Sequence, residues 1–505
     1  MSPAPLQHSD IFEETGRSDI YVRPDHPMKI EEGPRSGGVV IPEDERRLLL
    51  DYVSWRKNPP VQGSGRSGLV TRREVLEAGT AQIVRYQLKG VLYSDHETGL
   101  VRPPSTERYW HRLVNKREDR GRTADETRTR IIGLIPRQIT HMGVNDDGSF
   151  RPVPDPPKPE GGLGPKRAER EFQIAAQLHR AGIPACRPVD WGRYPELLWE
   201  GAPMEYVILS LPPEIDPHRM SDYFQPTIIQ EKPHWSRAMQ NIISQQFDVF
   251  DPANLGPCAL KVTAQMARAN GKVLREAHER GRVVRFAGHT GNFSYARRTK
   301  TALMHDFDSS VKLDDLHPQA RALTIIRDIE SALFGFLHSL AHSNLFYLSK
   351  NEEAFRRVNP LGQILTGYFE GDIGLEALKP YLDRVSNAAL DAIKSRGELP
   401  STLDQAKWLG HMAEVLIRFF MLLVFKLYPL SRWASTDPLP HNDEKRLLAD
   451  IQAFGIQGER MNLEHILQHG KTMPDWAREQ LAEDLIPPDS PLDYRLQIRR
   501  ELGLG

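Results

Sequence analysis

The sequence is poor in cysteine. Only Cys186 and Cys258 occur among 505 residues, and neither has the spacing of a metal-binding motif. Structural disulfides belong to oxidising compartments, whereas isolated thiols are usually small, buried, apolar residues. The two cysteines therefore favour a protein of a reducing compartment, and we expect a cytoplasmic location.

The sequence also lacks a long apolar segment. The most apolar stretch is FFMLLVF at residues 419–425, between Arg418 and Lys426, whereas a helix that crosses a bilayer needs about 20 apolar residues. The first residues, MSPAPLQHSDIFEE, are polar and acidic and do not have the apolar core of a signal peptide. We therefore expect no membrane partner, and a buried helix at residues 419–425.

Neither sign of charge dominates. Lys and Arg total 66 and Asp and Glu total 67, which gives a formal net charge of −1. A chain without excess positive charge has no overall field that attracts nucleic acid or an anionic membrane. We therefore expect no nucleic acid partner and only local electrostatic recognition. Hydrophobic residues make up 39% of the chain, which is enough for a substantial core.

The pattern of residues divides the chain into four parts. Residues 1–60 are expected to be a loose arm, rich in Pro, Ser, Gly and acids, with a short helix at 42–55. Residues 61–213 hold the strand-like runs AQIVRYQLKG and MEYVILSL, residues 214–440 are mainly helical, and residues 441–505 add a helical extension. The predicted fold class is α+β, with a smaller β-containing lobe before a larger α-helical one.

Shorter signals refine this division. Residues 143–165 predict a loop because Pro and Gly recur there. The next segment, KRAEREFQIAAQLHRAGIP, predicts a helix that ends at Gly182. A long amphipathic helix at 259–281 precedes two short strands, NFSYA and TALMHDF, joined by RRTK. Further helices are predicted at residues 320–340, 374–396 and 406–427.

Lys89 and Glu171 are the first candidate site residues. Lys89 ends an alternating strand and can project into a cleft, and Gly90 after it permits close approach of a phosphate. Glu171 lies on the next predicted helix, where it would orient the ammonium. Phosphoryl or nucleotidyl transfer requires a cation on the nucleotide phosphates and a carboxylate that holds it. The alternative is a solvated lysine at a strand end and a glutamate paired within its own helix.

Asn292 and Asp306 are the candidate metal ligands. The two short strands between them would return the chain, so that both side chains face one site. An amide oxygen and a carboxylate are hard ligands that suit Mg²⁺. Asp308, on the same side by strand alternation, is either a second metal contact or a hydrogen-bonding residue that fixes the loop. The alternative for Asp306 is a simple turn or cap residue.

Weaker signals accompany these residues. GSGRSG, with Gly63, Gly65 and Gly68, has the GxGxxG spacing whose backbone amides can cover phosphates, but a flexible linker is equally compatible. His289 would position a substrate or hold its loop, or it is structural. The basic turn at residues 297–300 would contact phosphate or an acidic substrate, or it is a solvated turn.

On these residues the chain resembles the protein-kinase-like superfamily, most of all the selenoprotein O family of AMP-transferring pseudokinases and more distantly the aminoglycoside phosphotransferases. YQLKG resembles the strand of the nucleotide lysine, here Lys89, and EREFQIAAQLHRAGIPACRPV the helix of its paired glutamate, here Glu171. GHTGN followed by HDFD resembles the loop asparagine and the metal aspartate, here Asn292 and Asp306. The resemblance spans residues 70–310 and implies a two-lobed kinase-like fold that uses ATP and Mg²⁺.

The loop before Asn292 departs from both families. Aminoglycoside-type kinases read Asp-Leu-His-Pro-Gly-Asn, with the aspartate as general base, where this chain has Ala287 in the aspartate's place. A methyl group cannot accept a proton. The selenoprotein O family also has an apolar residue at that position, but it carries an aspartate just before the metal asparagine, where this chain has Gly291.

Three functions stay open on this evidence. The first is an ATP- and Mg²⁺-dependent transferase that moves AMP, or phosphoryl, to a hydroxyl of a protein or metabolite. The second is a small-molecule phosphotransferase of aminoglycoside-kinase type, in which His289 or Asp308 replaces the missing base. The third is a non-catalytic, nucleotide-binding pseudokinase scaffold, which the presence of both metal-ligand candidates disfavours.

Overall fold

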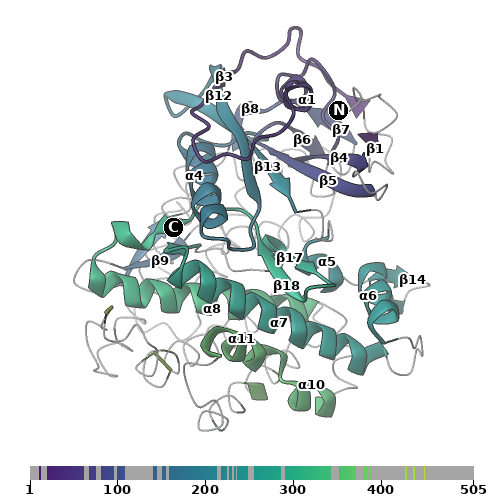
Figure 1. Cartoon of the computed structure of the whole chain (residues 1–505), viewed down its shortest axis with the longest axis vertical. Helices are drawn as coiled ribbons and strands as arrows, with labels where there is room; N and C mark the ends of the chain where they lie inside the picture. The colour runs from purple at the N-terminus through teal and green to yellow at the C-terminus, as the bar shows by residue number, and fades with distance from the viewer. Residues whose placement is uncertain are drawn as a thin grey trace, which may run out of the picture.

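The computed structural model describes residues 11–12, 20–61, 67–75, 81–95, 99–108, 140–144, 150–154, 159–212, 218–224, 227–229, 232–234, 236–247, 255–285, 290–342 and 352–370, with single positions between 380 and 449. The architecture is α+β, as predicted: the strands of the largest sheet come before residue 212 and the long helices of the lower part after it (Figure 1). The predicted extension at 441–505 and most of the helices predicted at 374–396 and 406–427 lie outside the described residues. Among the helices that are described, none is long and apolar enough to cross a membrane.

The upper part in Figure 1 is built on a six-stranded antiparallel sheet. Its order is β1 (Ile11–Phe12), β4 (Ser67–Val75), β5 (Ala81–Lys89), β13 (Ala202–Leu211), β12 (Arg187–Trp199) and β3 (Glu31–Glu32). Both predicted strands are present as β5 and β13, which pair directly, with Lys89 opposite Val207. Alternation along β13 sends Tyr206 and Ile208 to one core cluster and Val207 and Leu209 to another, on the opposite face.

Helix α1 (Glu43–Val53) covers the first face of this sheet. Its residues Leu49, Tyr52 and Val53 are buried in the same cluster as Tyr206 and Ile208. The boundary predicted at residue 60 was therefore wrong. The expected arm is part of the β-rich unit, because β3 pairs with β12 and α1 packs on the sheet.

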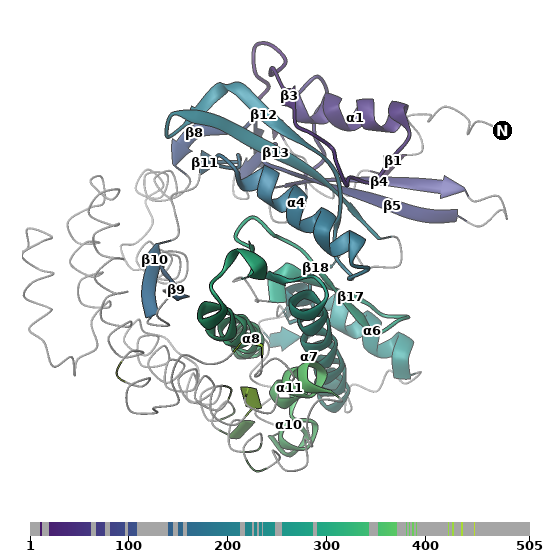
Figure 2. The same ribbon diagram turned by 60° about the vertical axis from the view of Figure 1, so that its left-hand side comes forward.

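Helix α4 (Arg167–Arg180) covers the opposite face, as both views show (Figures 1 and 2). It buries Phe172, Ala175 and Leu178 in the cluster that also takes Val207 and Leu209. The helix stops where predicted, because Gly182 adopts a positive φ of 68° and its amide bonds to the carbonyl of His179. Its buried face fixes the direction of Glu171, which is fully buried.

The lower part is helical and contains α5 (Met220–Phe224), α6 (Arg237–Phe247), α7 (Leu255–Glu279), α8 (Pro318–His342), α10 (Glu352–Val358) and α11 (Pro360–Phe369). Helices α7 and α11 pass very close to one another. A Cβ at Gly271 would lie 2.0 Å from the carbonyl oxygen of Ile364, and a Cβ at Gly367 would lie 2.0 Å from that of Arg268. The two glycines therefore allow backbone-to-backbone packing that no side chain would permit.

A two-stranded hairpin lies between α4 and the long helices (Figure 2). It consists of β17 (Phe293–Ala296) and β18 (Thr301–Met304), as the sequence predicts. It is tied to the end of α4, because Met304 donates its amide to the carbonyl of Pro184 and accepts from the amide of Cys186. Strand β18 ends at Met304, so the prediction that it continues through Phe307 was wrong.

Smaller strands complete the described chain. The structure has β2 (Ile20–Tyr21), β6 (Tyr93–Asp95) and β7 (Leu100–Arg102) in one sheet, and the pairs β14 (Thr227–Ile229) with β15 (Lys232–His234) and β16 (Val283–Val284) with β19 (Val311–Lys312). The expectation of a continuous loop at 143–165 was wrong. There, β9 (Thr140–Val144) pairs with β10 (Phe150–Pro154), and β11 (Pro159–Glu160) pairs with β8 (Ser105–Arg108). Short strands at a sheet edge tolerate proline because one side needs no amide donor.

Candidate functional site

Lys89 is the last residue of β5 and points to the α4 side of the sheet. Its neighbours Tyr86 and Leu88 are buried on the α1 side, so alternation leaves Gln87 and Lys89 on the other face. Ser67, at the start of β4, is the residue directly opposite Lys89 in the register. The side chain of Lys89 is 15% exposed. It therefore lies at the boundary between the sheet core and solvent.

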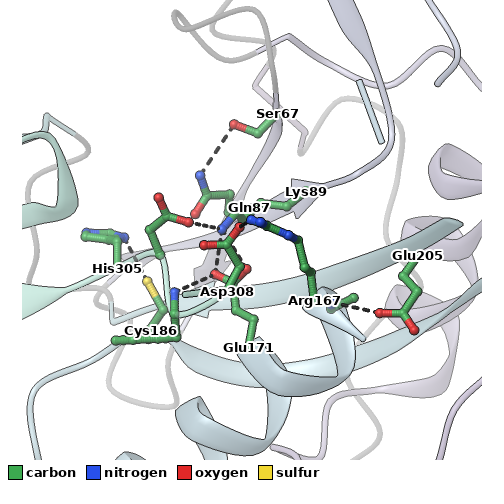
Figure 3. A network of polar contacts seen from close by, with 12 residues as sticks. Ser67, Gln87, Lys89, Arg167, Glu171, Cys186, Glu205, His305 and Asp308 are labelled. Carbon is green, nitrogen blue, oxygen red and sulfur yellow. Dashed lines mark hydrogen bonds and ion pairs between the residues drawn. The ribbon is translucent and has the colours of Figure 1, made fainter. Parts of the chain in front are cut away.

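Three carboxylate oxygens surround the ammonium of Lys89. The Nζ atom lies 2.7 Å and 2.6 Å from the two oxygens of Glu171, and 2.6 Å from Oδ1 of Asp306. The predicted pair of Lys89 and Glu171 is therefore present in the structure, and Asp306 joins it. Glu171 and Asp306 lie 82 and 217 residues from Lys89 in the sequence, so only the fold brings the three together. Figure 3 shows Glu171 and Lys89 pointing toward one another.

Burial and neighbouring charges shift the pKa values of both Lys89 and Glu171. Burial by itself lowers the pKa of Lys89, but the carboxylates of Asp306, Glu171 and Asp308 outweigh it and raise the pKa above its usual value. Burial raises the pKa of Glu171 to about 7, because the attraction of Lys89 does not fully offset the burial and the repulsion from the two aspartates. The ammonium thus stays charged, and Glu171 is the group of the pair that a change of pH affects.

Asp306 has an unusual backbone. Its φ is 65°, in the left-handed region that residues other than glycine seldom adopt. The side chain is 38% exposed, although it contacts Lys89. Non-glycine residues with such backbones are enriched at functional sites. The left-handed turn also explains why β18 ends early, since the chain leaves the extended conformation at this residue.

The backbone of the hairpin brings Asn292 close to Asp306. It ends the short helical turn η3 (Thr290–Asn292), and its carbonyl accepts a hydrogen bond of 2.9 Å from the amide of His305. The hairpin therefore returns the chain as the sequence predicts, and Asn292 faces the residue immediately before Asp306. An amide and a partly exposed carboxylate are hard donors of the kind that Mg²⁺ binds.

Asp308 has a partner that the sequence did not indicate. Its Oδ2 lies 2.6 Å from Nη1 of Arg167, the first residue of α4. The argument from strand alternation was wrong, because β18 ends at Met304 and Asp308 lies in a turn. Of the two roles predicted for Asp308, the structure contains the contact that fixes the loop (Figure 3).

Arg285 holds the backbone of the candidate site, and it was not identified from the sequence. It is fully buried, and its guanidinium donates to the carbonyl oxygens of His305 at 2.5 Å and Asn292 at 3.4 Å. The same group lies over the rings of Phe293 and Phe307. One side chain therefore holds the backbone of the candidate ligand Asn292 and of His305, the residue before the candidate ligand Asp306. A single arginine before a loop carries no pattern by which sequence alone would single it out.

His305 is held by its two ring nitrogens. Nδ1 lies 2.8 Å from Sγ of Cys186 and Nε2 lies 2.7 Å from Oγ of Ser294. Burial, together with Arg219, Arg285 and Lys89, lowers the pKa of His305 well below its usual value, so the ring is neutral. Burial raises the pKa of Cys186 to about 12. Both groups are therefore neutral hydrogen-bonding residues, and the expectation that the cysteine is an inert buried thiol fits this geometry.

Arg219 adds a cation that the sequence analysis missed. It donates from Nη2 to Oε1 of Gln87 at 3.3 Å, and Gln87 in turn donates to Oγ of Ser67 at 3.4 Å. Its Nη1 is buried and has no hydrogen-bond partner among the described residues. Burial lowers the pKa of Arg219, while Cys186, Asp306, Asp222 and Glu171 oppose that shift. A partly buried guanidinium that has a donor to spare and lies close enough to Asp306 to interact electrostatically with it is suited to bind an anion.

The glycines proposed as phosphate contacts are placed differently from the expectation. Gly68 lies inside β4, where a Cβ would be 3.0 Å from the carbonyl oxygen of Pro60. Gly90 has a φ of 77°, and a Cβ there would be 2.4 Å from the carbonyl oxygen of Glu205. Both therefore pack against protein backbone, and the phosphate approach expected at Gly90 is occupied by β13. Gly63, Gly65, Ala287 and His289 lie outside the described residues.

Within the described ranges there is no group of three or more His, Cys, Asp or Glu side chains placed to hold a metal ion. Protein sites for nucleotide-bound Mg²⁺ commonly use one or two carboxylates and complete the coordination with phosphate and water. Asp306 with Asn292 fits that smaller donor set. No family model matches the sequence, and a search of curated proteins found no match either.

Proposed function

We propose that the chain is a protein-kinase-like transferase that uses ATP and Mg²⁺ and moves AMP, or phosphoryl, to a hydroxyl of a protein or metabolite. The observation that carries the proposal is the contact of Lys89 with both Glu171 and Asp306. A strand lysine that joins a helix glutamate and a metal aspartate is the constellation on which the resemblance to the kinase-like superfamily rests.

The arrangement of elements supports a two-lobed kinase-like fold. An antiparallel sheet with α4 on one face precedes a helical part, and the hairpin with Asn292 and Asp306 lies between them (Figure 2). The strand order places the lysine strand β5 directly beside β13, whose last residue, Leu211, precedes the helical part. Within the superfamily, the segments around Lys89, Glu171 and Asp306 favour the selenoprotein O family.

Each residue has a role in this proposal. Lys89 and Arg219 bind phosphate oxygens, and Glu171 holds the ammonium of Lys89 in place. Asp306 and Asn292 would hold Mg²⁺, which would supply positive charge to the phosphates of a bound nucleotide. The left-handed backbone of Asp306 and the hydrogen bonds of Arg285 keep both ligands in position before a substrate binds.

The acceptor hydroxyl must lose a proton, and the usual general base for that step is absent from this chain. Ala287 stands where aminoglycoside-type kinases carry the general base, and Asp308, one of the two alternative bases, is engaged by Arg167. An oxygen that already accepts a hydrogen bond from a guanidinium is not placed to take a proton from a substrate hydroxyl. This disfavours the aminoglycoside-kinase alternative in the form that uses Asp308 as the base. The missing base is also the observation that favours the remaining alternative, a pseudokinase scaffold that binds nucleotide without transfer.

The proposal includes a reducing, cytoplasmic environment. Cys186 and Cys258 are both free thiols in the structure. Buried Cys186 serves His305 as a neutral partner, and oxidation would remove that partner. The prediction of a cytoplasmic location is checked by expression of a tagged chain and cell fractionation.

Transfer of label from ATP tests the function. The chain is incubated with Mg²⁺ and with ATP labelled at the α- or the γ-phosphate, using the chain itself and a dialysed protein extract as acceptors. Label from the α position supports AMP transfer, and label from the γ position supports phosphoryl transfer. Asp306→Asn removes either signal. Asp314→Asn, which changes an exposed aspartate paired with Arg282, is the matched control and retains it.

Binding measurements decide between the alternatives if neither label is transferred. Loss of Mg²⁺-dependent ATP binding in Asp306→Asn, measured by calorimetry, then supports the scaffold alternative. Unchanged binding in that variant, or no ATP binding by the parent chain, overturns the proposed nucleotide site altogether.

A further inference from the structure

The segment after β18 is held by α4 at two points. Oε1 of Glu171 accepts from the amide of Phe307 at 3.4 Å, and Nη1 of Arg167 donates to Oδ2 of Asp308 at 2.6 Å. Arg167 and Glu171 are four residues apart and lie on one face of the helix. The helix therefore holds Phe307 and Asp308, the two residues that directly follow the candidate metal ligand Asp306.

The position of Arg167 is set by the sheet. The side chain of Glu205, on β13, accepts hydrogen bonds from the amides of Ala168 and Glu169 at 2.9 Å and 3.3 Å. These amides belong to the first turn of α4, whose backbone donors have no partner within the helix. The start of α4, and with it the backbone of Arg167, is therefore fixed relative to the sheet. Figure 3 shows the side chain of Arg167 extending toward Asp308.

Without Arg167, Asp308 would be a second carboxylate next to Asp306. The two aspartates are two residues apart, and Asp308 is close enough to Lys89 and Glu171 to act on both electrostatically. Its side chain is 13% exposed, which leaves little water to stabilise its charge. A mostly buried, unpaired carboxylate in this position is stabilised by a cation, and oxygen donors of this kind select Mg²⁺, Mn²⁺ or Ca²⁺.

We infer that Arg167 is a positioning residue that keeps Asp308 out of the metal-ligand set. Because Asp308 is paired with Arg167, Asp306 and Asn292 remain as the protein's oxygen donors to the metal ion. A metal ion then binds well only when nucleotide phosphates supply further oxygens, so metal and ATP arrive together. This inference rests on the proposed metal role of Asp306 and names the residue that controls the composition of that site.

Binding of Mn²⁺ without nucleotide tests the inference, with free Mn²⁺ measured by electron paramagnetic resonance. We expect the parent chain to bind Mn²⁺ weakly and Arg167→Met to bind it at least about tenfold more tightly, because added carboxylates change the affinity of oxygen sites by powers of ten. Arg167→Lys keeps a cation beside Asp308 and remains close to the parent. The double variant Arg167→Met with Asp308→Asn returns to weak binding.

Two results would overturn the inference. The first is that Arg167→Met folds, by its circular dichroism and thermal midpoint, and binds Mn²⁺ no better than the parent. The second is that Asp308→Asn alone weakens Mg²⁺-dependent ATP binding as much as Asp306→Asn does, since Asp308 would then be a ligand already. If Arg167→Met does not fold, Arg167→Gln replaces it with the same expectation. Failure of the nucleotide site itself is distinguishable, because Asp306→Asn then leaves ATP binding unchanged.

Discussion

Two polar clusters in this molecule each contain an aspartate and differ in their exposure. One joins Lys89, Glu171 and Asp306, and its aspartate is 38% exposed. The other joins His278 and Asp328, whose side chains are 0% exposed, and the backbone amide of Arg285. In the second cluster His278 bonds to Asp328 at 2.9 Å and to the hydroxyl of Tyr368 at 2.6 Å. The first therefore remains accessible to a ligand, and the second is structural.

The difference shows how the helical part supports the site. Asp328, on α8, accepts from the amide of Arg285 at 2.9 Å, and the guanidinium of Arg285 reaches the carbonyls of His305 and Asn292. The buried cluster therefore fixes the backbone of Arg285, and the side chain of Arg285 in turn holds the segments that lead to the exposed cluster. Burial by itself raises the pKa of Asp328, but the hydrogen bonds from His278 and from the amide of Arg285 help to outweigh it and the pKa is lowered, so Asp328 remains an ionised acceptor at neutral pH.

The largest effect on stability is expected from Asp328→Ala. The change leaves His278 and the amide of Arg285 buried without their acceptor, and removal of one partner from a buried pair typically costs about 3–5 kcal/mol. Urea denaturation followed by circular dichroism measures the loss. A cost below about 1 kcal/mol, the range of exposed pairs, would contradict the structural role of this cluster.

The next largest effect is on ligand binding, through Lys89→Met. The variant removes the ammonium that would bind phosphate, so we expect Mg²⁺-dependent ATP affinity to fall by roughly 10- to 100-fold, the equivalent of one charge-assisted hydrogen bond. Calorimetry measures the affinity. Loss of ATP binding in Asp328→Ala at a temperature where it is folded, with retention in Lys89→Met, would reverse the assignment of the two clusters.

Glu171→Gln is expected to change the pH dependence of stability. The folded pKa of Glu171 is raised from 4.5 to about 7, so the folded state binds its proton more tightly than the unfolded state. Its contribution therefore lowers the free energy of unfolding as the pH rises from 4.5 to 7. Urea denaturation at several pH values should show a flatter curve for Glu171→Gln than for the parent over this window.

A matched control for that experiment is Glu196→Gln. Glu196 also pairs with a lysine, Lys29, but the two side chains are 61% and 74% exposed. The pH dependence of this variant should follow that of the parent. A flattened curve in Glu196→Gln, or an unchanged one in Glu171→Gln, would contradict the distinction between the buried and the exposed pair.

The smallest effect is expected from Lys29→Ala. Its ion pair with Glu196 is on the surface, where water screens the charges and the side chains lose entropy on pairing. We expect no measurable change in the thermal midpoint or in ATP binding. Comparison with Lys89→Met then separates the loss of a lysine–glutamate pair in general from the loss of the one at the candidate site.

Much of the local structure was predictable from the sequence because it follows from short-range patterns. The alternation in AQIVRYQLK predicted β5, and the apolar face with Gly182 at its end predicted α4. The hairpin between Asn292 and Met304 was also predicted, apart from its end. These are cases in which the period of the hydrophobic residues specifies the element, and the element specifies the direction of the side chain.

The errors have a common physical origin. Residues 20–41 are rich in Pro, Gly and acids, so they were expected to be an arm, yet β3 joins the sheet through backbone hydrogen bonds that composition does not report. Strand β10 contains two prolines and was expected to be loop, but its pairing with β9 is antiparallel and local. In both, backbone pairing with another segment outweighed the preference of the residues themselves.

The sequence by itself determined that the chain is α+β, that Lys89 ends a strand and that Glu171 lies on a helix. Only the tertiary structure decided that Asp306 completes this pair in a left-handed backbone, that Arg167 holds Asp308, and that Arg219 and Arg285 converge on the site. The reason is physical. A periodic pattern orients a side chain relative to its own element, whereas the choice of a charged partner 141 or 217 residues away depends on how the elements pack.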